Sequence, residues 1–166
     1  MTFDARAVAN QLLDFSDTHG IDVGTLSLQK ILYYCHGWWL LEKGNPLISQ
    51  SFEAWDHGPV VRLVYDALKE IPKYQPIRSR ISFLNFNSGE IEEPRPDLGN
   101  HGMTFLDEVF RYYARIRVYD LVEMTHAPES PWDEVYFEKI VSPGMQISND
   151  RILSHFQSFR EFRFQH

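Results

Sequence analysis

The 166-residue chain is long enough for one domain whose apolar core needs neither a metal nor a disulfide to be stable. Charged residues make up 23% of the chain and its formal net charge is −7, so its mean electric field repels phosphate. This charge disfavours nucleic acid as a partner, and it suits either a basic protein partner or solubility alone.

The first predicted helix follows directly after the N-terminus. Thr2 or Asp4 provides a side chain that can cap it, and Gly20 stands where a glycine commonly ends a helix. Its apolar residues fall near one face, which predicts packing on a core; they are Val8, Leu12, Leu13 and Phe15.

The second predicted helix is apolar on nearly every side, which is typical of a buried central helix. We expect Thr25 or Ser27 to cap it and the sequence Gly44-Asn45-Pro46 to end it. Gly37 in its interior costs about 1 kcal/mol relative to alanine, so we expect another backbone to approach closely there.

A short extended segment and a small hairpin interrupt the helical pattern. Residues 51–56 are predicted to be extended, and Gly58-Pro59 to form a corner that opens a helix over residues 60–68. Residues 81–86 and 90–93 are predicted to pair as a hairpin around a glycine-containing turn.

Further helices fill the C-terminal half. We expect Thr104 to cap one helix, a second to end near Thr125-His126, and a third to start at Ser130. Ser148 or Asn149 starts the last one. The prediction is therefore a mainly α fold: a single compact helical domain over residues 1–166, with six to seven helices and a small β-hairpin.

Several features of the sequence indicate the cellular compartment of the protein and the segments that a partner could contact. The single cysteine, Cys35, permits no internal disulfide, and the apolar run near Ile31–Leu41 is shorter than the roughly 20 residues that span a membrane. With no signal peptide evident, we expect a cytoplasmic protein without a membrane partner. The acidic segment Glu90–Asp97 is either a partner-binding face or a solvated loop. The basic and aromatic residues at 158–164 are interpreted as a frayed helix end.

The sequence contains no familiar catalytic or metal-binding motif. Its histidines include no His-x-x-x-His pair, one cysteine excludes a multi-cysteine zinc site, and no glycine-rich phosphate loop or serine elbow occurs. Cys35 lies on the apolar stripe, and neighbouring His36 points about 100° away, so Cys35 is interpreted as a buried hydrophobe. We therefore expect no enzyme activity, no cofactor and no metal.

One polar cluster remains. Lys30 stands on a largely apolar helix, so its amine must reach water or pair with a carboxylate, and Glu53 is the nearest candidate along the chain. The pair either fixes the Gly58-Pro59 corner or forms part of a pocket that binds a ligand or a partner. The candidate site residues are Lys30, Tyr33, Glu53, Trp55, His57, Thr125, His126 and Trp132.

The same segments resemble a known family. In order and spacing they are similar to the Panacea domain of SocA-like antitoxins, also described as DUF4065 or phage-associated GepA-like proteins. The resemblance runs from about residue 5 to residue 157. The matching segments are Leu28-Gln29-Lys30-Ile31-Leu32-Tyr33, Gly37-Trp38, Pro46-Leu47, Glu53-Ala54-Trp55-Asp56-His57-Gly58-Pro59-Val60-Val61, Leu121, Thr125-His126, Pro131-Trp132, Ile147 and Phe156.

The resemblance implies the antitoxin of a two-gene toxin–antitoxin system, which binds and silences a cognate protein toxin encoded by the neighbouring gene. One branch of the family instead delivers its toxin to a ClpXP-type protease, so a proteolytic adaptor is the first alternative. The second is an uncharacterised phage-associated enzyme with a Lys/Glu/His pocket. It requires Lys30, Glu53, His57 and His126 to converge on an open pocket.

Overall fold

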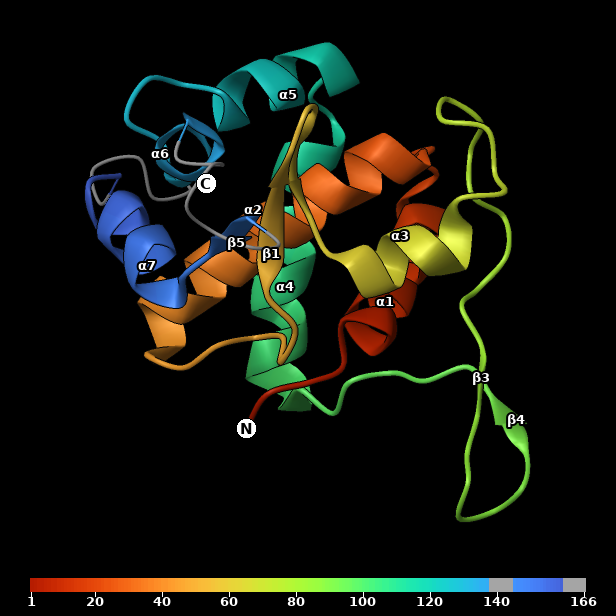
Figure 1. The fold of residues 1–166 in the computed structure, drawn as a ribbon. Helices are drawn as coiled ribbons and strands as arrows, with labels where there is room; N and C mark the ends of the chain where they lie inside the picture. The colour runs from red at the N-terminus through yellow and green to blue at the C-terminus, as the bar shows by residue number, and fades with distance from the viewer. Residues whose placement is uncertain (138–144, 160–166) are drawn as a thin grey trace.

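The computed structural model describes residues 1–137 and 145–159. These residues form seven helices and two small antiparallel sheets (Figure 1), which confirms the predicted mainly α fold with a hairpin. The helices are α1 (Ala5–His19), α2 (Thr25–Lys43), α3 (Arg62–Leu68), α4 (Gly99–Ala114), α5 (Val118–Thr125), α6 (Pro131–Phe137) and α7 (Asn149–Gln157). The strands are β1 (Phe52–Trp55), β2 (Gly58–Val60), β3 (Phe83–Leu84), β4 (Ile91–Glu92) and β5 (Gln146–Ile147).

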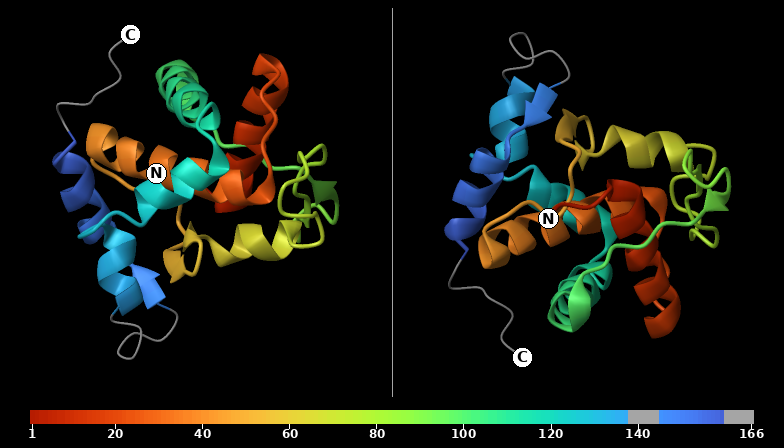
Figure 2. Two further views of the ribbon diagram at one scale, coloured as in Figure 1. Left: turned by 90° about the horizontal axis from the view of Figure 1, so that it is seen from above. Right: turned by 90° about the horizontal axis from the view of Figure 1, so that it is seen from below.

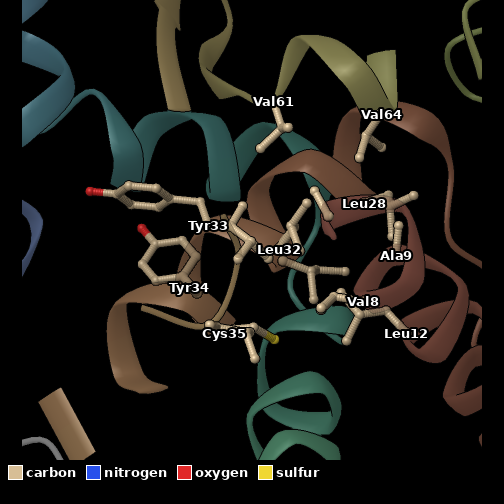
Figure 3. Close-up of a cluster of buried hydrophobic side chains, with 14 of the residues drawn as sticks. Val8, Ala9, Leu12, Leu28, Leu32, Tyr33, Tyr34, Cys35, Val61 and Val64 are labelled. Atoms are coloured by element: carbon tan, nitrogen blue, oxygen red, sulfur yellow. The ribbon is translucent and has the colours of Figure 1, made fainter. Parts of the chain in front are cut away.

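Helix α2 runs through the middle of the molecule, and the other helices surround it (Figures 1 and 2). Residues 28–40 of this helix are all buried, as its apolar pattern predicts. Tyr34 and Cys35 lie in an apolar cluster shared with side chains of α1 and α3 (Figure 3). Burial raises the pKa of the Cys35 thiol, which confirms its interpretation as a small hydrophobe.

Most predicted helix ends are confirmed, because local chemistry determines them. The side chains of Asp4, Ser130 and Ser148 each accept a hydrogen bond from a backbone N–H of the helix that follows. Gly20 and Gly44 end α1 and α2 in the left-handed conformation, with φ of 62° and 74°.

Two predicted caps are wrong. Helix α2 begins at Thr25 after Gly24, and no side chain caps it, so neither Thr25 nor Ser27 plays that part. Helix α4 begins at Gly99, one and a half turns earlier than predicted, and Thr104 lies in its interior with its hydroxyl donating to a backbone carbonyl one turn back.

The Gly58-Pro59 corner is a strand, not the first turn of a helix. Strands β1 and β2 pair antiparallel, with Trp55 opposite Gly58, across a two-residue turn. The predicted helix over residues 60–68 therefore starts only at Arg62. Strand β5 pairs on the other side of β1 and completes a three-stranded sheet that the sequence did not predict.

Gly37 makes room for a side chain, and not for a second backbone as the sequence predicted. A Cβ atom at this position would overlap the ring of Phe156, which is fully buried on α7. The glycine thus lets α7 pack directly against the middle of α2.

The predicted hairpin is present as β3 and β4, with Leu84 opposite Ile91. It extends away from the helices (Figure 1). Of the C-terminal segment 158–164, residues 160–164 lie outside the described residues.

Candidate functional site

Lys30 is the only lysine of the candidate site and is completely buried (0% exposed). Its Nζ donates a hydrogen bond of 2.7 Å to the carbonyl oxygen of Pro59 on β2. Because burial penalises the charged form, the pKa of Lys30 falls from 10.5 to about 7. At physiological pH much of the amine is therefore neutral, and in this form it can still donate the hydrogen bond to Pro59.

The expected pairing of Lys30 with Glu53 is wrong. Within the described part of the chain Lys30 forms no ion pair, and Glu53 instead binds Arg62 through two hydrogen bonds of 2.8 and 3.1 Å. Strand alternation explains the separation: Phe52 and Ala54 are buried, so Glu53 and Trp55 project from the opposite face of β1.

Gly58 allows the strand to lie directly against Lys30. Its φ of +104° is a conformation that other residues rarely adopt. A Cβ atom here would lie 2.6 Å from Oγ1 of Thr125 and 2.7 Å from Cε of Lys30. The Gly-Pro pair of the motif thus has two roles: glycine supplies space, and proline supplies the carbonyl acceptor.

Helices α5 and α6 close this buried cluster from the other side. The rings of His126 and Trp132 stack with centroids 3.7 Å apart, and Trp132 Nε1 donates to the carbonyl of Trp55. The Nε2 atom of His126 is buried and makes no hydrogen bond to any of the described residues. Burial, reinforced by the nearby Lys30, lowers the pKa of His126.

One further residue, Gln29, belongs to this region, although it was not in the predicted set. The Gln29 side chain both accepts from the backbone N–H of Val61 (2.9 Å) and donates to its carbonyl (3.2 Å). It therefore fixes the end of β2 while Lys30 fixes its middle. Gln29 stands beside Lys30 in the motif, and an amide on a helix that is otherwise apolar was the signal that could have revealed it.

Tyr33 lies apart from the polar cluster. It is buried among the rings of Tyr34, Phe52 and Phe156, with centroids 5.4 to 5.8 Å away. Burial raises the pKa of its hydroxyl. Its position is that of a core aromatic residue.

A groove of about 670 Å³ runs between the β1–β2 hairpin, α3 and the start of α2. Trp55, His57, Arg62 and Tyr65 line part of it. The Arg62 guanidinium lies 5.2 Å from the centre of the Trp55 ring, and Tyr65 packs edge-on against that ring at 4.7 Å. Lys30 does not line this groove, so Lys30 and His57 do not converge on one open pocket.

The described residues contain no group of three or more His, Cys, Asp or Glu side chains arranged to hold a metal ion. Nor does any helix in residues 1–137 and 145–159 have both the length and the apolar character required to cross a membrane.

Comparison with known proteins places the same residues in a family pattern. A family model described as antitoxin SocA-like, Panacea domain, matches residues 28–133, a span that runs from Leu28 in the first turn of α2 to Asp133 in α6. Antitoxin SocA of Caulobacter vibrioides (strain NA1000 / CB15N) is 38% identical over 136 residues, which cover 80% of this chain and 70% of that protein. No solved structure matches the chain.

Proposed function

Since this chain belongs to the SocA-like antitoxin family with a Panacea domain, we propose that it neutralises a cognate protein toxin by binding it directly. We infer further that the neighbouring gene encodes this toxin and that the two proteins meet in the cytoplasm. Membership of an antitoxin family, not of an enzyme family, supports a role in binding over a role in catalysis.

The burial of Lys30 carries the proposal. This amine is the most chemically distinctive group of the matched motif, yet it is 0% exposed and its hydrogen bond goes to the chain's own Pro59. Gly58 and Thr125 pack against the same side chain. These contacts support a role for the motif inside the scaffold, which leaves the surface of the scaffold to recognise the partner.

That surface offers aromatic residues, which are enriched at the hot spots of protein interfaces. Large side chains are exposed on several segments, among them Tyr65, Tyr112 and Phe86. The net charge of −7 favours a basic partner surface, because opposite charges speed association.

Co-expression with the neighbouring gene tests the proposal. We expect that gene alone to arrest growth, and this protein to restore growth and to co-purify with the gene product as one complex by size-exclusion chromatography. The variant Lys30→Met provides a sharper test, because it removes the amine without altering the surface. A folded Lys30→Met protein should still neutralise, whereas an enzyme that depends on the amine would lose activity.

Toxin turnover separates direct binding from proteolytic delivery. After translation is blocked, direct binding predicts that the toxin half-life is the same with or without a ClpXP-type protease. A half-life shortened only when this protein and the protease are both present would overturn direct neutralisation in favour of an adaptor. Failure of both growth rescue and co-purification would reject the antitoxin proposal itself.

A further inference from the structure

Residues 82–93 form a projecting element, which we call the hairpin arm. It contains β3, β4 and the turn between them, and it extends from one end of the helical body in both Figure 1 and Figure 2. Figure 1 also places it at the opposite end of the molecule from α5.

The base of the arm is fixed to α1 by a buried amide. Asn10 is 0% exposed, and its side chain both accepts from the N–H of Ile81 and donates to the carbonyl of Ile81, each at 2.8 Å. The same amide also donates to the carbonyl of Pro94 at 3.1 Å. One side chain therefore holds both legs of the arm, and the cost of burying an amide is met by these bonds.

Ion pairs reinforce this base. Arg80 precedes the arm and Arg95 follows it, and both bind the Asp14 carboxylate on α1. The Arg6 guanidinium lies 4.4 Å from the centre of the Phe83 ring, on the side of the arm that faces the body. The direction of the arm is thus determined by α1.

The tip of the arm is also ordered by its own hydrogen bonds. The Asn85 N–H donates to the Glu90 carbonyl, and the Gly89 N–H donates to the Asn85 carbonyl, each at 2.8 Å. The Asn85 side chain accepts from Asn87 N and donates to Glu92. A tip held in this way loses little conformational entropy when it binds.

This ordered tip presents its apolar side chains to water. Phe86 is 90% exposed, and the cross-strand pair Leu84 and Ile91 is 48% and 77% exposed. A hairpin that served only the core would turn this pair inward. Exposed apolar side chains gathered on one ordered hairpin are typical of a protein-binding surface.

The charge of the arm indicates the kind of partner. Between Ile81 and Pro94 the sequence has Glu90, Glu92 and Glu93 and no lysine, arginine or histidine. An apolar tip surrounded by acidic residues complements an apolar pocket with a basic rim.

We propose that the hairpin arm is the toxin-docking element of this protein: Phe86, Leu84 and Ile91 enter an apolar pocket of the toxin whose rim carries lysine or arginine. The inference rests on the proposed antitoxin function. It goes beyond that function in assigning recognition to a surface remote from the Lys30 cluster and from the Trp55 groove.

The test uses the full-length protein and the purified product of the neighbouring gene. The double variant Phe86→Ala/Ile91→Ala should bind that product about 30-fold more weakly or worse, the effect of removing an interface hot spot. Its thermal midpoint should match that of the wild type, because neither side chain contributes to the core. Tyr119→Ala, which removes an exposed ring on α5, is the matched control and should bind normally.

Charge reversal supplies an independent measurement. Glu90→Lys should slow association and reduce its dependence on salt, whereas Glu123→Lys on the exposed side of α5 should not. Wild-type-like affinity of the double variant would overturn the inference while leaving direct neutralisation intact. A second outcome would also overturn it: the wild-type protein is a dimer, and the double variant becomes monomeric but binds the toxin unchanged. The arm would then contact a second copy of this protein and not the toxin. If the wild-type protein itself does not bind the gene product, the antitoxin proposal fails first.

Discussion

Lys30 and Pro59 are joined inside the protein by a hydrogen bond of 2.7 Å from an amine to a backbone carbonyl. A carbonyl is a neutral acceptor and cannot hold a charge in place as a carboxylate would. This relationship changes what a substitution at Lys30 does. An ion pair would leave a lone buried carboxylate behind, whereas here only a carbonyl oxygen loses its donor.

The first prediction concerns the pH dependence of stability. Burial lowers the pKa of Lys30 to about 7 in the folded protein from 10.5 as its ordinary value. Between these pH values the unfolded chain binds a proton at Lys30 that the folded chain does not, so the contribution of Lys30 to the free energy of unfolding should rise with pH. Below pH 7 both states are protonated and this contribution becomes constant.

Lys30→Met should remove this dependence, because methionine is long, apolar and does not titrate. At pH 7 the variant should be more stable by roughly 2 kcal/mol, since the relieved ionisation cost exceeds the roughly 1–3 kcal/mol lost at the Pro59 carbonyl. Urea unfolding at pH 7, 7.5, 8 and 8.5 measures both effects, below the pH at which buried Cys35 and Tyr33, whose pKa values are raised, begin to lower stability. Lys43→Met, which removes an exposed lysine from the same helix, controls for loss of charge. A wild-type stability that falls across this range would contradict the prediction.

The second prediction compares two glycines with positive φ. Gly58→Ala places a Cβ against Thr125 and Lys30 in addition to straining the backbone, whereas Gly20 has φ +62° and nothing within 4 Å of a built Cβ. We expect Gly20→Ala to cost about 1 kcal/mol and Gly58→Ala roughly 3 kcal/mol or more. Thermal unfolding of the two variants side by side measures the difference. Equal costs would mean that the contact with Lys30 does not require glycine.

Local patterns predicted the parts of the fold that depend on neighbouring residues. The continuous apolar character of α2 was enough to identify a buried central helix, and the caps at Asp4 and Ser148 followed from side-chain chemistry one turn away. The β3–β4 hairpin was equally visible, because its two strands are joined by a short turn.

The predictions for the start of α4 and for β5 failed because contacts between residues distant in sequence override local conformational preference. Helix α4 opens with glycines and an asparagine that favour a loop, yet Gly102 packs tightly on the ring of Trp39, and this contact supports the extra turn. The pairing of Phe52 with Ile147 joins residues far apart in sequence, so no local signal predicts β5.

The structure brings together part of the predicted site residues, and their arrangement differs from the prediction. Lys30, Thr125, His126 and Trp132 do lie around one cluster, whereas Glu53 and His57 face elsewhere. Nearness in the chain suggested Glu53 as the partner of Lys30. The alternation of Phe52 and Ala54 with Glu53 and Trp55 already indicated the opposite face. Whether any of these residues contacts a partner remains a prediction.

The third prediction concerns acid stability. His36 is fully buried between α7 and the chain after α2: its Nε2 donates to Asn149 at 2.8 Å, and its Nδ1 accepts from the N–H of Ile48. Burial lowers its pKa from 6.5 to about 4, although the bond to Asn149 opposes this shift. The unfolded chain therefore binds more protons between these pH values, and stability should fall as the pH drops from 6.5 towards 4.

His36→Gln should make this loss of stability shallower by roughly 3 kcal/mol between pH 7 and pH 4, because glutamine does not titrate. Denaturant unfolding at pH 7, 6, 5 and 4 measures the slope. His101→Gln removes an exposed histidine from α4 and should leave the slope of the wild type. Identical slopes for both variants would show that His36 is not the group responsible.

The fourth prediction tests why residue 37 is glycine. Alanine at this position raises helix propensity by about 1 kcal/mol, but its Cβ overlaps the ring of Phe156, so we expect Gly37→Ala to destabilise the protein by about 1–3 kcal/mol. In a Phe156→Leu background the smaller side chain leaves room for the new methyl group. There, Gly37→Ala should be neutral or stabilising.

A double-mutant cycle measured by urea unfolding gives the coupling between the two positions. We expect a coupling free energy of about 1–3 kcal/mol, in the range found for side chains in direct contact. Because Phe156 is fully buried on α7 against aromatic rings of α2, the single variant should also loosen α7 and alter the fluorescence of Trp38, whose ring lies 5.2 Å from that of Phe156. Additive costs in the cycle would mean that the glycine serves the helix backbone and not the ring.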